Sequence, residues 1–331
     1  MDIPGLGKIE DPDFYLDIAF KKGAKAASEV RSNVKGERLK KSKQIELKRM
    51  MVIKKELAGT LEKIPKAYPS FDNLHIFYQD LISLYFSIDD LRKSLGAIDW
   101  CAKKLNDMFK IYSSKLRKCQ DFRKVNEIRR SFSGRISSLL KQVKKDLLFL
   151  EECRKAMKNF PTIKTKLYTV AIAGFPNVGK STLLSKISKS KPEIQAYAFT
   201  TKKLNLGYLM QNHKKIQLVD TPGTLNRFEK MNVIEKQAFL TIKYIAHQIL
   251  YIFDLTQSSY PLESQVKLYS RLKKEFRKPI LIYLSKTDMF DEDEKEEIIQ
   301  KFRNDKKYKE FKEAIYDIEE LKSKIAEYAK E

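Results

Sequence analysis

A glycine-rich octapeptide near the middle of the 331-residue chain is the strongest chemical signal in the sequence. It runs from Gly174 to Ser181 and matches the pattern GxxxxGK[ST]. The β-rich run Leu167–Ala173 precedes it and a helical pattern begins near Lys180, which is the strand–loop–helix context that this pattern requires. Backbone N–H groups of such a loop, together with the positive end of the helix, hold phosphate oxygens. We therefore expect a nucleotide-phosphate site made of Gly174, Phe175, Pro176, Asn177, Val178, Gly179, Lys180, Ser181 and Thr182.

Two further segments carry groups that could hold Mg²⁺ and sense the γ-phosphate. Asp220 ends the apolar run Ile216–Val219, and a carboxylate there can hold Mg²⁺ through water. Ser181 would ligate the same ion, and Lys180 would reach the β- and γ-phosphates. The two segments are Phe199-Thr200-Thr201 and Asp220-Thr221-Pro222-Gly223. We expect Thr201 to ligate Mg²⁺ and the N–H of Gly223 to contact the γ-phosphate. The other residues of both segments are expected to contact the nucleotide as well: Phe199, Thr200, Thr221 and Pro222.

The segment Ser285-Lys286-Thr287-Asp288 follows the apolar run Pro279–Leu284 and indicates which base is bound. A carboxylate at Asp288 can accept hydrogen bonds from N1–H and the exocyclic amine of guanine, whereas adenine lacks that pair of donors. Sites built on such buried hydrogen bonds can reject the wrong partner by ~10⁴-fold or more. Ser285 and Lys286 join the expected nucleotide contacts, and the three segments in this order predict a GTPase whose catalytic groups include Lys180, Thr201 and Gly223.

The secondary structure expected around these residues differs between the two halves of the chain. Apolar residues of the first half recur at helical spacing in two stripes, Ile88–Leu116 and Val125–Leu150, which predict two long helices joined near Gln120–Asp121 as an antiparallel hairpin. Ser87 and Asp90 form an expected capping pair at the start of the first.

The second half alternates short β-rich runs with amphipathic helical segments. The expected strands are Leu167–Ala173, Lys203–Met210, Ile216–Val219, Ile249–Phe253 and Pro279–Leu284. This alternation predicts a mostly parallel sheet with helices on both faces. We expect an α + α/β fold: a basic helical domain at 1–165, as a bundle or hairpin, followed by a P-loop GTP-binding domain at 166–331.

Positive charge is the main compositional feature, with a formal net charge of +23. Between Lys115 and Lys145 there are eleven basic residues and two acids, and between Arg31 and Arg49 eight basic residues and two acids. Such clustering favours phosphate contact over an ordinary solvated helix face. The candidate RNA contacts are Arg123, Lys124, Arg129, Arg130, Arg135, Lys141, Lys144 and Lys145.

Other features of the composition exclude several classes of protein. Three cysteines without CxxC spacing argue against a disulfide framework, a disulfide-linked partner or a zinc cluster, and they favour a cytoplasmic location. The three scattered histidines argue against a histidine-based metal site. No apolar run approaches the ~18 residues of a membrane-spanning helix, and no lipidation motif is present, so we expect no membrane partner.

The motifs also resemble a known family. The octapeptide and the segment Phe199-Thr200-Thr201 are similar to the first two motifs of the Obg group of GTPases. The helical half resembles the N-terminal domain of the Nog-type nucleolar GTP-binding proteins in the segments 69–78, 94–100, 133–135 and 148–150, and 232–238 resembles that family's segment after DTPG. The similarity covers nearly the whole chain, without the long C-terminal extension of the eukaryotic forms, as in a short archaeal type. It implies a role in assembly of the large ribosomal subunit, with the helical domain contacting ribosomal RNA or the large-subunit precursor.

Several positions depart from the family pattern. Ser285 stands where asparagine is commoner, which removes an amide that usually braces the phosphate loop and predicts modest affinity. Met231 replaces a usual arginine, and 313–319 occupies the place of the last guanine motif without resembling it, so no guanine contacts are assigned there. In GTPases with a similar loop, the asparagine equivalent to Asn177 can hold K⁺; a purely loop-stabilising role is equally consistent with the sequence.

The rate of hydrolysis is left open by the sequence. Thr224 and Leu225 follow Gly223, where Ras-like enzymes carry a glutamine that orients water. We therefore expect slow hydrolysis without an activator, with Mg²⁺ as cofactor and K⁺ as a candidate second ion. The alternative is a nucleotide-gated RNA-binding module with negligible turnover. A membrane-linked or trafficking GTPase is the least favoured interpretation.

Overall fold

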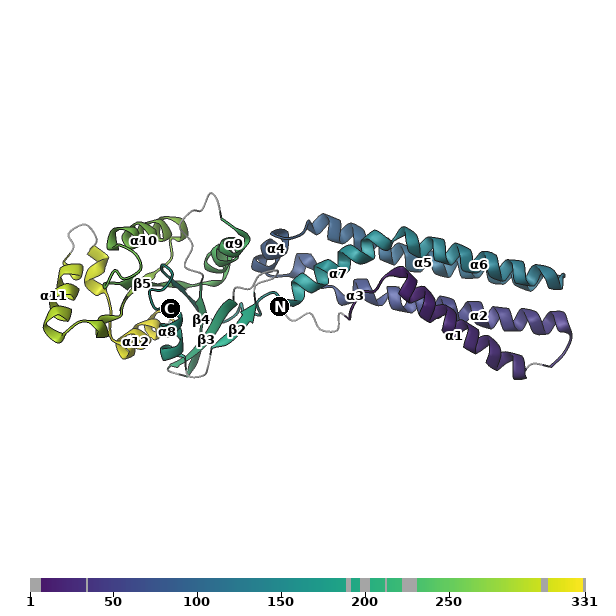
Figure 1. Ribbon diagram of the computed structural model, residues 1–331, viewed down its shortest axis with the longest axis horizontal. Helices are drawn as coiled ribbons and strands as arrows, with labels where there is room; N and C mark the ends of the chain where they lie inside the picture. Colours follow the sequence, from purple (N-terminus) through teal and green to yellow (C-terminus); the bar gives the residue numbers. More distant parts are fainter. Residues whose placement is uncertain are drawn as a thin grey trace. The chain divides into compact units, whose positions relative to one another are not determined.

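The computed structural model describes residues 7–33, 35–188, 192–196, 203–211, 213–221, 231–304 and 309–329. The chain forms two compact units. A helical unit comprises Asp2–Asn73 and Tyr85–Lys158, and an α/β unit comprises Leu74–Leu84 and Asn159–Glu331. This is the predicted combination of a helical N-terminal domain with a P-loop α/β domain (Figure 1).

The helical unit is built from long antiparallel helices whose apolar stripes face one another. Ser87 caps the helix α5 by accepting a hydrogen bond from the N–H of Asp90 at 3.2 Å, as predicted. Asp121 caps α6 through the N–H of Arg123 at 2.8 Å, so the chain reverses at residues 119–121. In the described residues, no helix is both long and apolar enough to cross a membrane. The helices of this unit are α1 Pro12–Asn33, α2 Arg38–Leu61, α3 Lys63–Ala67, α5 Ile88–Lys118, α6 Phe122–Gln142 and α7 Lys144–Lys158.

The second predicted long helix is interrupted at Val143. This residue has φ −93° and ψ 15°, and its N–H donates to the carbonyl of Leu140 at 3.2 Å. A tightened turn of this kind divides the segment into α6 and α7, and a β-branched residue at the junction favours the break because it has a lower helix propensity. The apolar stripe is buried before and after Val143, at Phe132, Ile136 and Leu147 among others. The predicted buried face is therefore confirmed, whereas the prediction of one continuous helix is wrong.

The α/β unit contains a six-stranded sheet in the order β2-β3-β4-β1-β5-β6. Strands β4, β1, β5 and β6 are parallel, and β2 and β3 extend the sheet as antiparallel strands. The strand β2 was not predicted from the sequence. The bounds are β1 Thr169–Ala173, β2 Glu193–Ala196, β3 Lys203–Gln211, β4 Lys214–Asp220, β5 Gln248–Asp254 and β6 Ile280–Ser285.

Helices follow the carboxyl ends of the parallel strands, which meet at one edge of the sheet. Open α/β sheets bind ligands at this edge. Its residues include Asp220, Asp254 and Ser285, the last residues of β4, β5 and β6. The helices of this unit are α4 Ile76–Ser83, α8 Lys180–Ile187, α9 Val233–Leu240, α10 Leu262–Phe276, α11 Glu292–Arg303 and α12 Ile318–Tyr328, with a π-helical turn at Thr241–Ile245.

The helix α4 lies within the sequence range 1–165 but packs with the α/β unit. The hydroxyl of Tyr244 donates to Asp80 Oδ2 at 2.6 Å, and that of Tyr78 donates to the carbonyl of Pro161 at 3.0 Å. The chain therefore passes between the units three times, after Asn73, Leu84 and Lys158, rather than once.

Candidate nucleotide site

The phosphate loop between β1 and α8 is shaped by residues with positive φ. Gly174 has φ +148° and Gly179 has φ +95°, values that glycine adopts readily. A Cβ atom at Gly174 would lie 2.9 Å from the carbonyl oxygen of Ile252, so a larger residue would displace the loop from β5. Asn177 also has positive φ, 63°, which asparagine tolerates better than most residues. The sequence pattern is thus explained by backbone geometry.

Lys180 begins α8 with a side chain that is folded against its own loop. The residue is 8% exposed, and its Nζ donates to the carbonyl oxygen of Phe175 at 2.5 Å. Burial lowers the pKa of Lys180, and the charge of Asp220 acts in the opposite direction. A phosphate held by the loop would offer this ammonium group a stronger acceptor than a carbonyl oxygen.

A hydroxyl and a carboxylate meet beside the loop. Ser181 Oγ donates to Asp220 Oδ2 at 2.6 Å, and Asn205 Nδ2 donates to the same oxygen at 3.1 Å. Asn205 lies opposite Asp220 in the pairing of β3 with β4, a placement that sequence spacing could not reveal. Thr221 is 1% exposed and its hydroxyl donates to the carbonyl of Ile172 at 2.7 Å, so it anchors the strand end to β1.

Ser285 joins the guanine segment, residues 285–288, to the phosphate loop. Its Oγ lies 2.6 Å from the carbonyl oxygen of Val178 and 3.1 Å from that of Phe253. The amide that usually braces the phosphate loop is absent, as the sequence indicates, but the Ser285 hydroxyl contacts the same loop. The modest affinity expected from the substitution stays a prediction.

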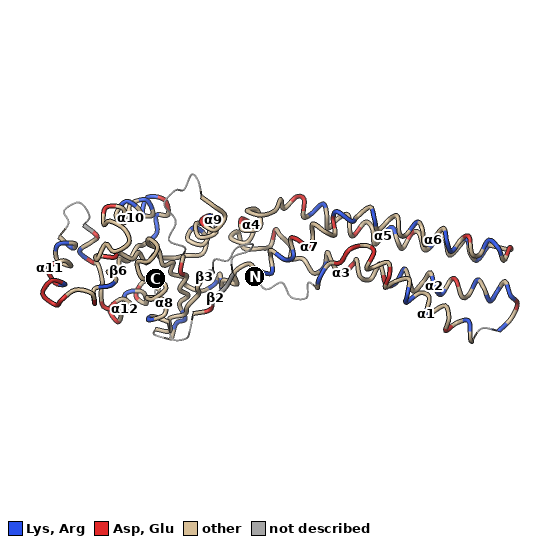
Figure 2. Tube along the Cα trace, viewed as in Figure 1, with Lys and Arg blue, Asp and Glu red and all other residues tan. Residues whose placement is uncertain are grey.

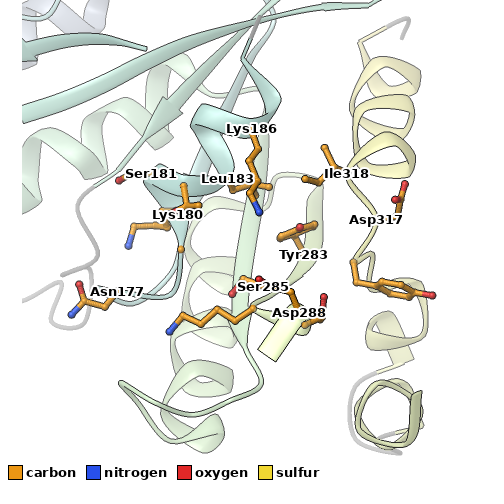
Figure 3. A pocket seen from close by; sticks show the side chains of 15 residues that line it. Asn177, Lys180, Ser181, Leu183, Lys186, Tyr283, Ser285, Asp288, Asp317 and Ile318 are labelled. Atoms are coloured by element: carbon orange, nitrogen blue, oxygen red, sulfur yellow. The ribbon is translucent and has the colours of Figure 1, made fainter. Parts of the chain in front are cut away.

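These segments enclose one cavity of about 720 Å³ (Figure 3). Figure 3 shows Asn177, Lys180 and Ser181 on one side and Asp317 and Ile318, from the start of α12, on the other. Asp288 is exposed within this cavity. Of the nucleotide contacts predicted from the sequence, the following line the cavity: Asn177, Gly179, Lys180, Ser181, Thr182, Ser285, Lys286 and Asp288.

Other predicted contacts lie behind the cavity or outside the described residues. Phe175 and Val178 are buried, at 3% and 0% exposure, and support the loop from its inner side. Gly174 and Pro176 belong to the same loop as lining residues, and Asp220 contacts the lining residue Ser181 in space, but these three residues and Thr221 do not line the cavity themselves. The switch residues Phe199, Thr200, Thr201, Pro222 and Gly223 lie outside the described part of the chain.

The cavity also has a wall that sequence reasoning missed. Ile315 pairs with Tyr283 beside β6, and the chain then enters α12, whose N-cap Asp317 accepts a hydrogen bond from the N–H of Glu320 at 2.8 Å. The Asp-x-x-Glu spacing was a detectable capping signal. Free N–H groups at a helix start can donate to a ligand carbonyl. The lining residues missed were Leu183, Lys186, Tyr283, Thr287, Tyr316, Asp317 and Ile318.

Figure 2 shows Lys and Arg recurring along the helices of the helical unit. The candidate RNA-contacting side chains fall into two groups. Arg129 is half-buried and lies 3.7 Å from the buried carboxylate of Glu46, and Lys144 lies 3.0 Å from Asp11 Oδ2. These two side chains form ion pairs within the protein. The others are exposed and form no ion pair within the described residues: Arg123, Lys124, Arg130, Arg135, Lys141 and Lys145.

Two family models match the chain in succession. The NOG1 N-terminal helical domain matches residues 9–164, and the 50S ribosome-binding GTPase matches residues 169–286. The uncharacterized protein MJ1408 of Methanocaldococcus jannaschii is 37% identical over 284 residues, which cover 85% of this chain and 79% of that protein.

Nucleolar relatives are similar over a shorter share of their own length. Nucleolar GTP-binding protein 1 of Drosophila melanogaster is 30% identical over 279 residues, covering 82% of this chain and 43% of that protein. A solved structure from Plasmodium falciparum, described as nucleolar GTP-binding protein 1, is 25% identical and covers 52% of this chain and 90% of that one, with a TM-score of 0.40. The chain thus spans less than half of the Drosophila protein. With a NOG1-type helical domain followed by a P-loop GTPase domain, the chain belongs to the Nog-type family of nucleolar GTP-binding proteins.

Proposed function

We propose that the protein is a Mg²⁺-dependent GTPase that acts as a switch in large ribosomal subunit assembly and contacts ribosomal RNA through its helical unit. The observation that carries the proposal is the cavity that unites Lys180 and Ser181 of the phosphate loop with Asp288 of the guanine segment. Its occurrence in a chain with a NOG1-type helical domain supports the ribosomal role. The three cysteines are free, which supports a reducing cytoplasm as its location.

The oxygen ligands beside the loop fit Mg²⁺. Ser181 Oγ and Asp220 Oδ2 lie 2.6 Å apart, and such hard oxygen donors are those that Mg²⁺ prefers, usually with retained waters and substrate phosphates. When bound, Mg²⁺ would neutralise charge on the phosphates. Ser181 would then ligate the ion directly and Asp220 through water, while Asn205 holds the carboxylate in place by its hydrogen bond of 3.1 Å.

The remaining roles divide between binding and switching. Lys180 would move from the Phe175 carbonyl to the β- and γ-phosphates, and Asp288 would accept from the guanine N1–H and amine. Thr201 and Gly223 would respond to the γ-phosphate, so that their segments order with GTP and are released after hydrolysis. Asn177 lines the cavity and is our candidate for K⁺ binding.

The proposed RNA-contacting surface runs along α6 and includes one end of the helical unit, where the two basic runs converge. Lys43 Nζ, on α2, donates to the carbonyl of Arg117, on α5, at 2.9 Å. The guanidinium of Arg38 lies 4.3 Å from the ring centre of Phe122 at the start of α6. These contacts join the start of α2 to the turn between α5 and α6, so basic residues far apart in sequence share one end of the bundle. Such clustering favours a polyanion such as RNA.

The alternative is a nucleotide-gated RNA-binding module with negligible turnover, which Thr224 after Gly223 favours. Single-turnover GTP hydrolysis, in K⁺ and in Na⁺, with and without large-subunit precursor particles, separates the two. We expect slow hydrolysis that K⁺ or the particles accelerate, and GTP-dependent retention of the protein on the particles. No hydrolysis in any condition would favour the alternative, and retention that is indifferent to nucleotide would refute the switch.

A further inference from the structure

A buried carboxylate lies behind the guanine segment and has no role in the site described above. Asp254 is the last residue of β5, and its side chain is 0% exposed. Its Oδ2 lies 2.7 Å from Lys286 Nζ and accepts from Ser258 Oγ at 3.0 Å. Its Oδ1 accepts from the N–H and the hydroxyl of Thr256, at 3.0 and 2.5 Å. A fully buried charge persists only with such partners.

The hydrogen bonds keep this carboxylate ionised. Burial alone would raise the pKa of Asp254, but the hydrogen bonds from Lys286, Thr256 and Ser258 outweigh burial and lower the pKa. The Lys286 ammonium also donates to Ser258 Oγ at 2.8 Å. The side chain of Lys286 is therefore held at its tip by Asp254, the last residue of β5, and by Ser258 of the loop that follows β5.

The same loop is connected to the phosphate loop through Gln265 of α10. Gln265 Oε1 accepts from the N–H of Asp254 at 2.8 Å, and Nε2 donates to the carbonyls of Asp254 and Tyr260 at 2.9 Å each. The ring of Tyr260 lies 4.2 Å from that of Phe175, measured between ring centres. We call Asp254, Thr256, Ser258, Gln265 and Lys286 the Asp254 cluster. Lys286 places the cluster in the guanine segment. Gln265 links it to Tyr260, whose ring contacts Phe175 of the phosphate loop.

The backbone of Lys286 shows why this anchoring matters. Lys286 has φ 56°, a left-handed conformation that is unfavourable for a lysine. It lies between Ser285, whose hydroxyl is fixed on the phosphate loop, and Asp288, which reaches the cavity two residues later. A strained turn persists when its surroundings fix it. The Lys286 carbonyl accepts from the N–H of Met289 at 3.1 Å, and the Lys286 side chain is paired with Asp254 at 2.7 Å.

We propose that Asp254 is a positioning residue for guanine recognition: by holding the Lys286 ammonium it fixes the turn that presents Asp288 to the base. This inference rests on the proposed binding of guanine nucleotides. Asp254 does not line the cavity, so its effect is on the geometry of Asp288. Loss of the ion pair should therefore weaken binding and also reduce discrimination between guanine and hypoxanthine, which lacks the exocyclic amine that Asp288 reads.

The test uses the full chain with Asp254→Asn, Lys286→Met and the double variant. Asn keeps the size of the carboxylate, and Met keeps the alkyl stem of lysine. The probe is fluorescent mant-GDP, displaced by unlabelled GDP and by IDP. Hydrogen-bond partners that orient metal ligands contribute about 10- to 100-fold to affinity, and by the lower end of that range we expect each single variant to bind mant-GDP about tenfold more weakly. The ratio of IDP to GDP dissociation constants should fall toward one, and the double variant should lose no more than the worse single variant.

The matched control is Glu263→Gln, which removes an exposed carboxylate from the first turn of the neighbouring helix α10. It should retain the wild-type affinity and base ratio. An unchanged base ratio in folded Asp254→Asn, or additive losses in the double variant, would overturn the inference. If Asp254→Asn melts below the assay temperature, an unchanged ratio in Lys286→Met overturns it instead. Absence of mant-GDP binding by the wild type would refute the proposed function, whereas wild-type binding with unaffected variants would refute this inference alone.

Discussion

Three basic residues on one face of α6 give the sharpest test of the RNA-binding surface. Arg130 and Lys141 lie 7 and 18 residues after Arg123 in the helix Phe122–Gln142. At 3.6 residues per turn these separations return to within about 20° of the same direction, and the rise of 1.5 Å spreads the three over about 27 Å. All are exposed and lack ion pairs among the described residues. Changing all three to glutamine removes +3 without uncovering an acid.

The magnitude follows from counterion release. Each neutralised phosphate contributes about 0.7 to 0.9 to the slope of log affinity against log salt, so three lost contacts should flatten the slope by about 2 to 3 units. Over a rise from about 50 to about 200 mM salt, this makes the salt-induced loss of affinity about 20- to 40-fold smaller than in the wild type. Exposed sites of this kind change the free energy of unfolding by about 0.5 kcal/mol or less each.

The assay is RNA affinity against salt concentration, with circular dichroism as the folding control. The matched variant replaces Lys21, Lys93 and Lys103 with glutamine. It removes the same charge from lysines that are paired with Asp17, Asp90 and Asp99 on α1 and α5. Its slope should stay near that of the wild type. Equal slopes in the two triple variants would refute a localised RNA-contacting face and assign the effect to net charge. GTP binding should be unchanged in both.

Three further predictions concern single residues. Asp288→Asn should shift preference from guanosine to xanthosine diphosphate in displacement assays, since an amide donor complements the second carbonyl of xanthine; equal loss for both would show that Asp288 does not read the base. Arg129→Gln should lower the free energy of unfolding by about 1 kcal/mol in urea titrations, because buried Glu46 loses one of two arginine partners and keeps Arg49 at 2.9 Å; a loss no greater than that of Arg130→Gln would contradict this. Burial lowers the pKa of His247 below 6.5, and its Nδ1 accepts from the N–H of Thr169 at 3.1 Å. The unfolded chain therefore binds a proton at His247 more readily than the folded chain. The contribution of neutral His247 to the free energy of unfolding should be complete above pH 6.5 and be lost as the pH falls through the pKa of the folded state. His247→Asn should reduce this loss, and identical pH profiles of the two proteins would refute the assignment.

Local sequence was sufficient for the features that depend on neighbouring residues. The phosphate loop could be predicted because its glycines, lysine and serine lie within eight residues, and its function depends on backbone conformations that only certain residues allow. The stripe from Val125 to Leu150 predicted a buried helical face for the same reason. Its break at Val143 could not be predicted, because one tightened turn leaves the apolar spacing unchanged.

The residues that complete the site from distant parts of the chain depend on strand pairing and could not be predicted from the sequence. Asn205 reaches Asp220 because β3 and β4 pair in a particular register, and neither residue carries a signal of that contact. Asp254 and Lys286 are 32 positions apart, and they pair because the ends of β5 and β6 are adjacent. Sequence periodicity identifies which side chains are buried, whereas the register of the strands and the packing between helices determine which polar groups meet there.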